Sequence, residues 1–524
     1  MRRRLIPFAL PLAVAGLVLA GCAVTAQPGS STDTSTSTSQ TTTETIAEVD
    51  ATIPAAAADL LAANADGTVG KDDEWSIADA VDVTLSGATA TSSSSAVAVD
   101  GSTVTISAAG VYRLSGTLDG QVVVDAPEDA LVVLVLDGAT VTNADGSAIH
   151  VVSADDVAVN LAAGSTNTIT GASSADADAS AAIYADTDLT ISGSGSLTVT
   201  DSGNDGISAT DDLAIIGGTI TVDAADDGLR GKDSLVVKDG AVSITAGGDA
   251  LKSDQTDDAT QGYVWIAGGT IDATAGDDGI DAQTDAVVTG GAITLATDDD
   301  GIHSETALAI AGGQIDITRS YEGIESADIR IAGGATSVTS SDDGVNASGN
   351  STSGGGGMGG GGGMQDSGET LTISGGTLRI DADGDGLDSN GTISMTGGEV
   401  TVYGPTSNGN GALDSNGGIT VSGGTLVAIG SSGMAESPET SSAQGWLAAA
   451  VDGSDGSSIQ ITDATGAVIA SYTGVKDFQT VVFSSAAISS GQSYTVTVDG
   501  TATTVAAGQA VSGGMGGGMG GGRP

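Results

Sequence analysis

A short acidic turn recurs along the middle of this chain and limits what the chain can fold into. The best copies read Asp-Asp-Gly followed by Ile, Leu or Val, at 226–229, 277–280, 299–302 and 342–345. The residue before the glycine, or its counterpart in weaker copies, falls at 205, 227, 249, 278, 300, 322, 343, 385 and 411, and the commonest step is 22 residues. A fixed period of this size is typical of a chain whose repeats stack on one another.

Each repeat also carries two short strand signals. Residues 308–313 read Leu-Ala-Ile-Ala-Gly-Gly and residues 314–317 read Gln-Ile-Asp-Ile, so apolar residues alternate with polar or small ones. Side chains of a strand point alternately to its two faces, which places Ile, Leu and Val on one face. The glycines of the Gly-Gly and Asp-Gly pairs are expected to supply positive φ at the corners.

The predicted fold class is therefore all-β, a right-handed parallel β-helix (a solenoid of about 22-residue coils) with a small C-terminal β cap. Strands this short cannot form a free-standing sheet, but equivalent strands of stacked repeats become parallel neighbours. The alternative is an immunoglobulin-like array or a β-sandwich. Sandwiches also have turns every ~8–12 residues, but they do not repeat one acidic tetrapeptide at a fixed longer step.

The N-terminus reads as an export signal. Arg2 to Arg4 are followed by an apolar stretch that ends in Leu19-Ala20-Gly21-Cys22, similar to the lipobox of bacterial lipoproteins. We predict a signal peptide over 1–21 and lipidation of Cys22, the single cysteine of the chain. The alternative is an ordinary cleaved signal. A lipid at Cys22 implies a cell-membrane protein anchored on the extracytoplasmic face.

Composition sets the remaining boundaries. Residues 22–70 form a Ser/Thr/Ala-rich linker, and 71–435 form the β-helix, most regular over 203–430 and interrupted by a Gly/Met-rich insertion at 349–367. Residues 436–511 are the predicted C-terminal β cap, and 512–524 are a Gly/Met-rich tail.

The net charge of −53 argues against a nucleic-acid partner and against electrostatic attachment to anionic lipid. An anionic partner would be repelled unless a cation intervenes. We expect a monomer.

Stacking brings the acidic turns into a column, where neighbouring carboxylates about 4.8 Å apart repel one another. Bound cations would relieve this repulsion, and hard oxygen ligands outside the cytoplasm favour Ca²⁺. Turn chemistry alone is the alternative, because Asp and Gly are common in turns. The predicted calcium ligands are Asp226, Asp227, Asp249, Asp277, Asp278, Asp281, Asp299, Asp300, Glu322, Glu325, Asp342 and Asp343.

A few basic and aromatic residues lie beside the acidic turns and are candidate contacts to a sugar. Cations could pair with sugar carboxylates or hydroxyls, and aromatic rings could stack on a sugar ring. The alternatives are salt bridges within the column and ordinary packing. The candidates are Arg230, Lys252, Tyr263, Trp265, Arg319 and Tyr321.

An ordered series of motifs resembles a known family. It comprises Gly-Val-Tyr-Arg-Leu-Ser-Gly-Thr-Leu (110–118), Leu-Thr-Ile-Ser-Gly-Ser-Gly-Ser-Leu-Thr-Val (189–199), Ala-Asp-Asp-Gly-Leu-Arg-Gly-Lys-Asp (225–233), Ser-Tyr-Glu-Gly-Ile-Glu-Ser (320–326) and Gly-Asp-Gly-Leu-Asp-Ser-Asn-Gly (384–391). Over roughly residues 75–500 the chain resembles secreted bacterial carbohydrate-binding proteins with a pectate-lyase-like right-handed β-helix. The resemblance implies calcium binding, adhesion to cellulose and to acidic plant polysaccharides such as polygalacturonate, and an absence of demonstrated lyase activity.

These observations favour a non-catalytic, calcium-dependent polysaccharide-binding lipoprotein. Calcium would bridge the carboxylates of the protein to those of a uronate polymer. Two alternatives remain. One is a calcium-dependent polysaccharide lyase with Arg230 or Lys252 as base. The other is a structural surface adhesin or spacer without sugar specificity.

Overall fold

The computed structural model describes residues 53–65, 67, 75–349 and 366–511. All of these residues belong to one compact unit, Glu44–Pro524. The predicted signal peptide, the lipidation site Cys22, the tail at 512–524 and most of the insertion at 349–367 lie outside the described residues. Among the described residues, no helix has the length and apolar character that a membrane crossing requires.

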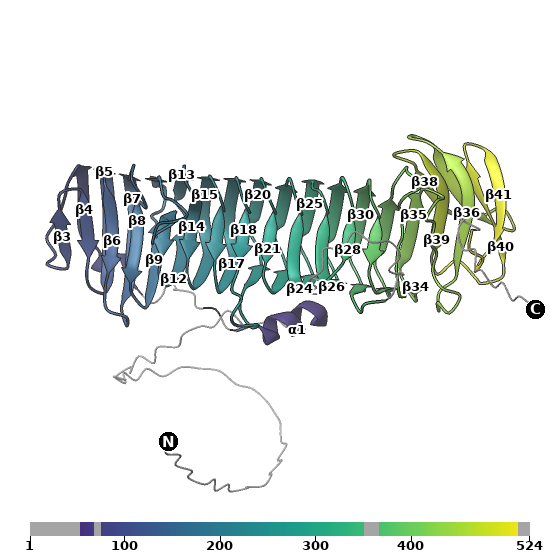
Figure 1. Cartoon of the computed structure of the whole chain (residues 1–524), viewed down its shortest axis with the longest axis horizontal. Coiled ribbons are helices and arrows are strands. Elements are labelled where there is room, and N and C mark those ends of the chain that lie inside the picture. The colour runs from purple at the N-terminus through teal and green to yellow at the C-terminus, as the bar shows by residue number, and fades with distance from the viewer. Residues whose placement is uncertain (1–52, 66, 68–74, 350–365, 512–524) are drawn as a thin grey trace, which may run out of the picture. The chain divides into compact units, whose positions relative to one another are not determined.

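The body consists of three rows of mainly parallel strands. Within each row, successive strands follow one another along the body (Figure 1). The first row contains β1 (Val81–Gly87), β5 (Gly110–Asp119), β7 (Leu131–Thr142), β9 (Asp156–Leu161), β12 (Asp188–Gly193), β15 (Asp212–Ala224), β17 (Ser234–Ala246), β19 (Tyr263–Ile266), β22 (Asp285–Val288), β24 (Ile302–Ile310), β26 (Ile324–Ile331), β29 (Thr370–Ile373), β32 (Thr392–Met395) and β34 (Gly418–Val421).

The second row carries the acidic turns at the beginning of its strands. It contains β4 (Thr103–Ile106), β6 (Gln121–Asp125), β8 (Ile149–Ser153), β11 (Ala181–Ala185), β14 (Asp205–Ala209), β16 (Leu229–Gly231), β18 (Leu251–Ser253), β21 (Ile280–Ala282), the first residues of β24 and β26, β28 (Val345–Ala347) and β31 (Leu387–Ser389).

The third row begins with the later residues of β5 and β7 and also includes those of β15 and β17. Its other members are β10 (Thr166–Gly171), β13 (Ser196–Asp201), β20 (Thr270–Ala275), β23 (Ala292–Ala296), β25 (Gln314–Arg319), β27 (Ala335–Ser340), β30 (Thr377–Ala382), β33 (Glu399–Tyr403) and β35 (Thr425–Gly430).

The all-β content agrees with the sequence, but the predicted architecture, a right-handed parallel β-helix, is wrong. Strands β5, β7, β15, β17, β24 and β26 each pass from one row into another, so 37 strands belong to one continuous sheet instead of separate faces of a solenoid. The body is a closed, mainly parallel β-barrel with additional strands. Alternation and spacing predict which residues pair, but they cannot show whether a strand continues through a corner.

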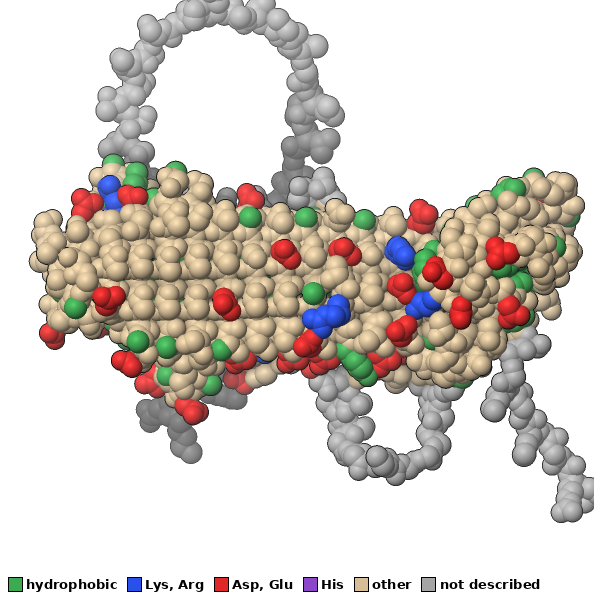
Figure 2. All heavy atoms as spheres, turned by 90° about the horizontal axis from the view of Figure 1, so that it is seen from above, with side chains coloured by type: hydrophobic (Ala, Val, Ile, Leu, Met, Phe, Trp, Pro, Cys, Tyr) green, Lys and Arg blue, Asp and Glu red, His purple; other side chains and the backbone are tan. Residues whose placement is uncertain are grey.

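Parallel pairing at the predicted spacing builds the core. Leu213 of β15 pairs with Leu235 of β17, and Ile302 pairs with Ile324, each 22 positions further along. Their side chains are buried in one apolar cluster that runs through the body. On the outer face drawn in Figure 2, polar uncharged side chains and backbone dominate, and acidic side chains are scattered.

Glycine has two different roles at the corners. The second glycine of a Gly-Gly pair has positive φ, as predicted, for example 82° at Gly313. The glycine of the acidic turn does not, which corrects the expectation from the sequence. A Cβ on Gly301 would lie 2.5 Å from the carbonyl oxygen of Gly323 in the next repeat, so glycine is needed there for close approach of the backbones.

Four elements begin the body or cover it. They are α1 (Ala55–Ala63), the short 3₁₀ helix η1 (Ile77–Asp79), β2 (Ala90–Ser92) and β3 (Val97–Asp100). Helix α1 lies within the predicted linker, and Leu60 and Leu61 are buried against the outward side chains of the first row. An Ala-rich segment without a strong apolar period gives no clear signal for a docked helix.

The C-terminal strands leave the parallel pattern. Strands β36 (Trp446–Gly453) and β39 (Phe478–Ser484) are antiparallel, and β39 also pairs with β35. A separate four-stranded sheet contains β37 (Ser458–Asp463), β38 (Val468–Thr473), β40 (Ser493–Val498) and β41 (Thr501–Ala506). These elements cover the end of the body in the segment that the sequence assigns to a cap.

Candidate functional site

The residues that precede the turn glycines, or Ala250 in one repeat, form a first column of carboxylates, which we call the turn column. Its members are Asp205, Asp227, Asp249, Asp278, Asp300, Glu322, Asp343 and Asp385. In most repeats one carboxylate oxygen accepts a hydrogen bond from the backbone N–H of the equivalent residue in the next repeat. Asp227 accepts from Asp249 at 2.9 Å, and Asp278 accepts from Asp300 at 2.8 Å. The carboxylates therefore have a structural role in the turns, as the alternative to calcium binding expected. This role uses one oxygen of each such carboxylate.

Burial makes ionisation of the turn column costly. It raises the pKa of Asp205 to about 7 and that of Asp385 to about 7, with further increases from neighbouring carboxylates. Burial likewise raises the pKa of Asp343 to about 6 and that of Glu322 to about 7. The backbone or side-chain N–H groups that bond these carboxylates act in the opposite direction, but they do not cancel the effect. At neutral pH the column therefore requires protons or cations.

A second column lies three residues after the first. Its members pair directly across neighbouring strands, and we call it the strand column: Ser208, Arg230, Lys252, Asp281, His303, Glu325, Asn346 and Asp388. The strand column changes character along the row, from two basic residues to mainly acidic and amide side chains. The two columns together decide how the charge of each repeat is balanced.

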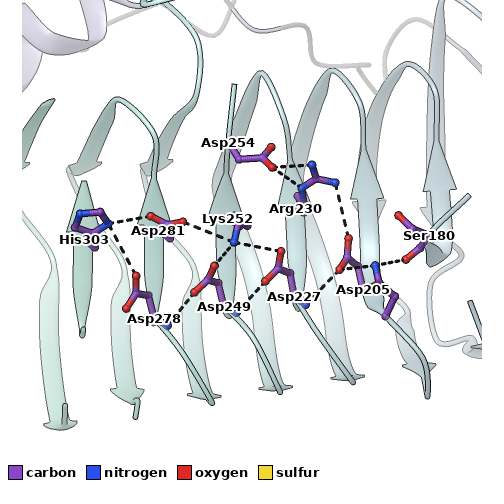
Figure 3. A network of polar contacts seen from close by, with 11 residues as sticks. Ser180, Asp205, Asp227, Arg230, Asp249, Lys252, Asp254, Asp278, Asp281 and His303 are labelled. Carbon is purple, nitrogen blue, oxygen red and sulfur yellow. Dashed lines mark hydrogen bonds and ion pairs between the residues drawn. The ribbon is translucent and has the colours of Figure 1, made fainter. Parts of the chain in front are cut away.

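In the earlier repeats, side chains of the protein itself supply the cations (Figure 3). Lys252 forms a short ion pair with Asp249, and its Nζ lies 3.6 Å from Asp227 Oδ2 and 3.8 Å from Asp281 Oδ2. Burial would lower the pKa of Lys252, but these three carboxylates outweigh burial and raise it.

Arg230 completes the balance in the earlier repeats. It binds Asp254 through Nε at 3.1 Å and Nη2 at 2.7 Å, and its Nη1 lies 4.0 Å from Asp205. Two cations of the chain therefore contact the turn column between Asp205 and Asp249.

His303 marks the transition between the two halves of the site. Its Nδ1 lies 3.0 Å from Asp281 Oδ1 and 3.9 Å from Asp278 Oδ2. Burial lowers the pKa of the imidazole, but the hydrogen bond to Asp281 and the charges of Asp281 and Asp278 raise it overall. Imidazolium is thus the favoured form here, and it compensates the two aspartates.

In the following repeat, the charge of His303 acts on Glu325 from the neighbouring strand. Oxygens of Asp300, Glu322 and Glu325 all lie within 4.8 Å of one another, and in the described part of the chain these residues form no ion pair with Lys or Arg. Burial, the charge of Asp278 and a contact with Glu325 raise the pKa of Asp300. We call Asp300, Glu322 and Glu325 the acidic triad. Together they concentrate negative charge on half-buried oxygens.

Asn346 adds a neutral oxygen beside the acidic triad. Its Nδ2 donates to Glu322 Oε2 at 2.9 Å, and its backbone pairs with that of Glu325. The amide is 8% exposed, and its buried Oδ1 has no hydrogen-bond partner among the described residues. A buried carbonyl oxygen without a donor is rare in native proteins and fits a cation ligand. The donor set of three carboxylates and one amide carbonyl suits a hard divalent cation such as Ca²⁺.

The structure brings eight of the predicted calcium ligands into groups that could hold a metal ion. These overlapping groups contain Asp249, Asp277, Asp278, Asp281, Asp299, Asp300, Glu322 and Glu325. Asp226, Asp227, Asp342 and Asp343 belong to no such group in the described part of the chain. Asp227 faces the ammonium of Lys252 instead.

His303 and Asn346 were not among the predicted ligands. Both occupy the same position as Asp281 and Glu325, three residues after the turn column. Comparing that one position across all repeats would have revealed the strand column.

Two of the predicted sugar contacts are buried. Tyr263 and Trp265 are 2% and 6% exposed and pack with α1, where the Tyr263 hydroxyl donates to the backbone oxygen of Ala65 at 3.1 Å. Arg230 and Lys252 are engaged by carboxylates, as described above. These four side chains therefore have structural partners in this arrangement.

Arg319 and Tyr321, by contrast, remain accessible beside the acidic triad. The Arg319 side chain is 54% exposed and pairs with Asp298, and Tyr321 is 47% exposed. A hydrogen bond to Asp342, with the charge of that carboxylate, raises the pKa of Tyr321 to about 12. Both side chains flank the turn that carries Glu322.

Comparison with known proteins points to a sugar-binding family. Residues 100–359 match the model of the family described as carbohydrate-binding domain-containing protein. A curated relative of that description from Acetivibrio thermocellus is 38% identical over 126 residues, which are 23% of this chain and 44% of the relative. The chain thus spans less than half the length of this curated relative.

A solved structure is also similar. It is described as the polysaccharide lyase-like protein from C. thermocellum, gadolinium derivative, and is 34% identical with a TM-score of 0.42, covering 44% of this chain and 95% of that chain. The family match includes the acidic turns from Asp205 to Asp343, together with the acidic triad. Residues 100–359, just under half of this chain, are similar to the carbohydrate-binding domain-containing protein family.

Proposed function

We propose that this chain is a non-catalytic, calcium-dependent carbohydrate-binding protein that is anchored outside the cytoplasm and binds acidic polysaccharides such as polygalacturonate, and also cellulose. The observation that carries the calcium dependence is the acidic triad with the unpartnered Oδ1 of Asn346. The similarity of residues 100–359 to a carbohydrate-binding family supports the class of ligand.

The electrostatics of the chain explain why a cation is needed. A protein with a net charge of −53 and a uronate polymer repel one another. Asp300, Glu322, Glu325 and Asn346 would hold the ion, leaving part of its coordination to the polymer. When bound, Ca²⁺ supplies positive charge that both sets of carboxylates can share.

Arg319 and Tyr321 are the residues that we assign to the sugar itself. Their exposed side chains flank the turn that carries Glu322, so a polymer reaching the acidic triad would pass them. A guanidinium suits a uronate carboxylate, and a phenol ring offers an apolar face and a hydroxyl.

We favour a non-catalytic role because the candidate bases are occupied. A lyase needs a base that can accept the α-proton of a uronate. Lys252 contacts three carboxylates, which raise its pKa, and Arg230 is held by Asp254. No observation in the described part of the chain favours the lyase, and none favours an inert spacer.

The proposed function can be tested by polygalacturonate binding to the full chain in calcium and in EGTA. We expect binding only in calcium, and we expect the double variant Glu322→Gln/Glu325→Gln to lose it. Asp272→Asn is a matched control, because Asp272 is an exposed carboxylate of β20 outside every metal-like group described above. Equal binding in EGTA, or full binding by the double variant, would remove calcium from the proposal.

The membrane anchor needs its own experiment, because Cys22 lies outside the described residues. Metabolic labelling with a fatty acid in a bacterial host should modify the chain but not the Cys22→Ser variant. An unlabelled wild-type chain would contradict the anchor without affecting sugar binding.

A further inference from the structure

A second feature that could receive a sugar lies outside the acidic columns, on the outer face of the first row. In β5 and β7, Tyr112 and Leu134 face the core, so the alternate residues Val111 and Val133 face outward. These outward side chains form a small apolar cluster of their own, against which Trp75 packs. The outer face of the first row is apolar again further along, where α1 covers it.

Residues before β1 turn this face into a cleft. A hollow of about 280 Å³ is bounded by Trp75, Ser76, Asp79, Gly110, Val111, Leu131 and Val133. Four of these residues come from the starts of β5 and β7, and Trp75, Ser76 and Asp79 come from η1 and the two residues before it. The size lies near the lower end of the range for small-molecule sites, which is roughly 300–1,000 Å³.

The strongest sign of a ligand is the indole N–H of Trp75. The Nε1 atom is buried and has no hydrogen-bond partner within the part of the chain that the structure describes. An indole N–H can only donate, and buried donors of this kind are normally satisfied in native proteins. The other two tryptophans obey this rule, since Trp265 donates to Thr289 at 3.0 Å and Trp446 donates to Glu439 at 3.1 Å. An oxygen acceptor would complete the cleft.

We propose that this cleft binds one neutral pyranose ring of a polysaccharide, independently of calcium. The apolar face of the ring would lie on Val111, Leu131 and the indole. A ring or hydroxyl oxygen would accept from Trp75 Nε1, and a sugar hydroxyl would donate to the exposed carboxylate of Asp79.

The lining explains why the sugar is neutral. Among the residues that the structure describes, no Lys, Arg or His lines the cleft, and Asp79 is the one charged residue. A uronate carboxylate would meet the like charge of Asp79. The inference rests on the proposed function only in assuming that the chain binds polysaccharide, because β5 and β7 contribute no residue to the acidic triad.

The test is a titration of the full chain in EGTA with neutral hexasaccharides of glucose, mannose and xylose, and with hexagalacturonate. Trp265 and Trp446 are buried, at 6% and 3% exposed, so a change in tryptophan fluorescence would report on Trp75. We expect a saturable response to at least one neutral hexasaccharide and none to hexagalacturonate. No response to any neutral probe, or a stronger response to hexagalacturonate, would overturn the proposal.

Variants assign the response to the cleft by calorimetry. Trp75→Phe keeps an aromatic ring but removes the donor, and Asp79→Asn removes the charge; each should weaken binding about tenfold. Trp265→Phe is the control and should bind as wild type. Unchanged affinity in both cleft variants would refute the site, and Asp79→Asn serves even if Trp75→Phe folds poorly.

The same preparations separate this proposal from the calcium site. Glu322→Gln/Glu325→Gln should keep neutral-sugar binding, and Trp75→Phe should keep calcium-dependent polygalacturonate binding. If the wild-type chain shows only one of these two activities, neutral-sugar binding or calcium-dependent polygalacturonate binding, the proposal for the other activity fails.

Discussion

Replacing Lys252 with Met gives the sharpest test of how the two columns work. The substitution keeps the length of the side chain but removes an ammonium shared by Asp227, Asp249 and Asp281. Two of these carboxylates, Asp227 and Asp249, are largely buried, at 6% and 2% exposed. Without the lysine they must become protonated, repel one another or recruit another cation.

The expected cost follows from burial. Removing one partner of a buried ion pair destabilises a protein by about 3–5 kcal/mol. Because the Lys252 side chain is 25% exposed, we expect about 2–4 kcal/mol at pH 7 in EGTA. For a unit of this size that corresponds to a fall in Tm of roughly 2–4 °C.

Calcium should reverse much of this loss. The three carboxylates freed by Lys252→Met converge on the former position of Nζ, a set of hard oxygens suited to Ca²⁺. A ligand at 100 times its Kd adds about 2.7 kcal/mol of stability. We therefore expect a larger calcium-dependent rise in Tm for the variant than for wild type, measured by differential scanning calorimetry.

Arg319→Met is the matched control, because Arg319 pairs with Asp298 where both side chains are more than half exposed. An exposed pair contributes about 0–1 kcal/mol, so the control should melt close to wild type. Equal melting of the two variants in EGTA, or no additional calcium effect in Lys252→Met, would refute the view that Lys252 acts as an internal cation for the turn column.

Three further predictions concern the later repeats. Burial and neighbouring carboxylates raise the pKa of Asp388 to about 8, far above its value in an unfolded chain, so the folded state binds more protons between about pH 4 and 8. Stability in EGTA should therefore fall as pH rises through this window, and a rising Tm would contradict it; calcium should flatten the dependence. Asn346→Asp should lower Tm in EGTA yet tighten calcium binding about tenfold by calorimetry, because it adds a charged ligand; unchanged affinity would place the ion elsewhere. Gly301→Ala should cost about 1–3 kcal/mol in chemical denaturation, because its Cβ would meet the Gly323 carbonyl oxygen, whereas Gly409→Ala, with open space, should be nearly neutral.

The sequence predicts the pairing better than the architecture. A step of 22 residues and the alternation of Ile with polar residues correctly place Leu213 beside Leu235 in a buried parallel pair. Whether β15 should end at Gly217 or continue through the corner depends on how the backbones on both sides align, which is not a local property. That difference separates the predicted β-helix from the closed barrel.

Tertiary contacts also decide which site residues remain accessible. Trp265 and Tyr263 looked like exposed aromatic side chains in a short strand, but α1 covers them from a segment about 200 residues earlier in the chain. Nothing in an Ala-rich stretch next to a Ser/Thr-rich region indicates such a partner. The acidic turns, in contrast, could be located from the sequence, because a recurring position in a stack becomes a column wherever the stack forms.

The strand column explains why one repeated turn can have different chemistry at different places. The turn column is tied to the backbone of the next repeat at Asp227, Asp249 and Asp278, so its geometry persists from repeat to repeat. The residue three positions later is free of that constraint. Where it is Lys252, the cation belongs to the protein. Where it is Glu325, the charge has no Lys or Arg partner among the described residues, and the same backbone presents oxygens that suit an external cation. A change at one position per repeat can therefore convert a structural ion pair into a candidate metal site without altering the turn.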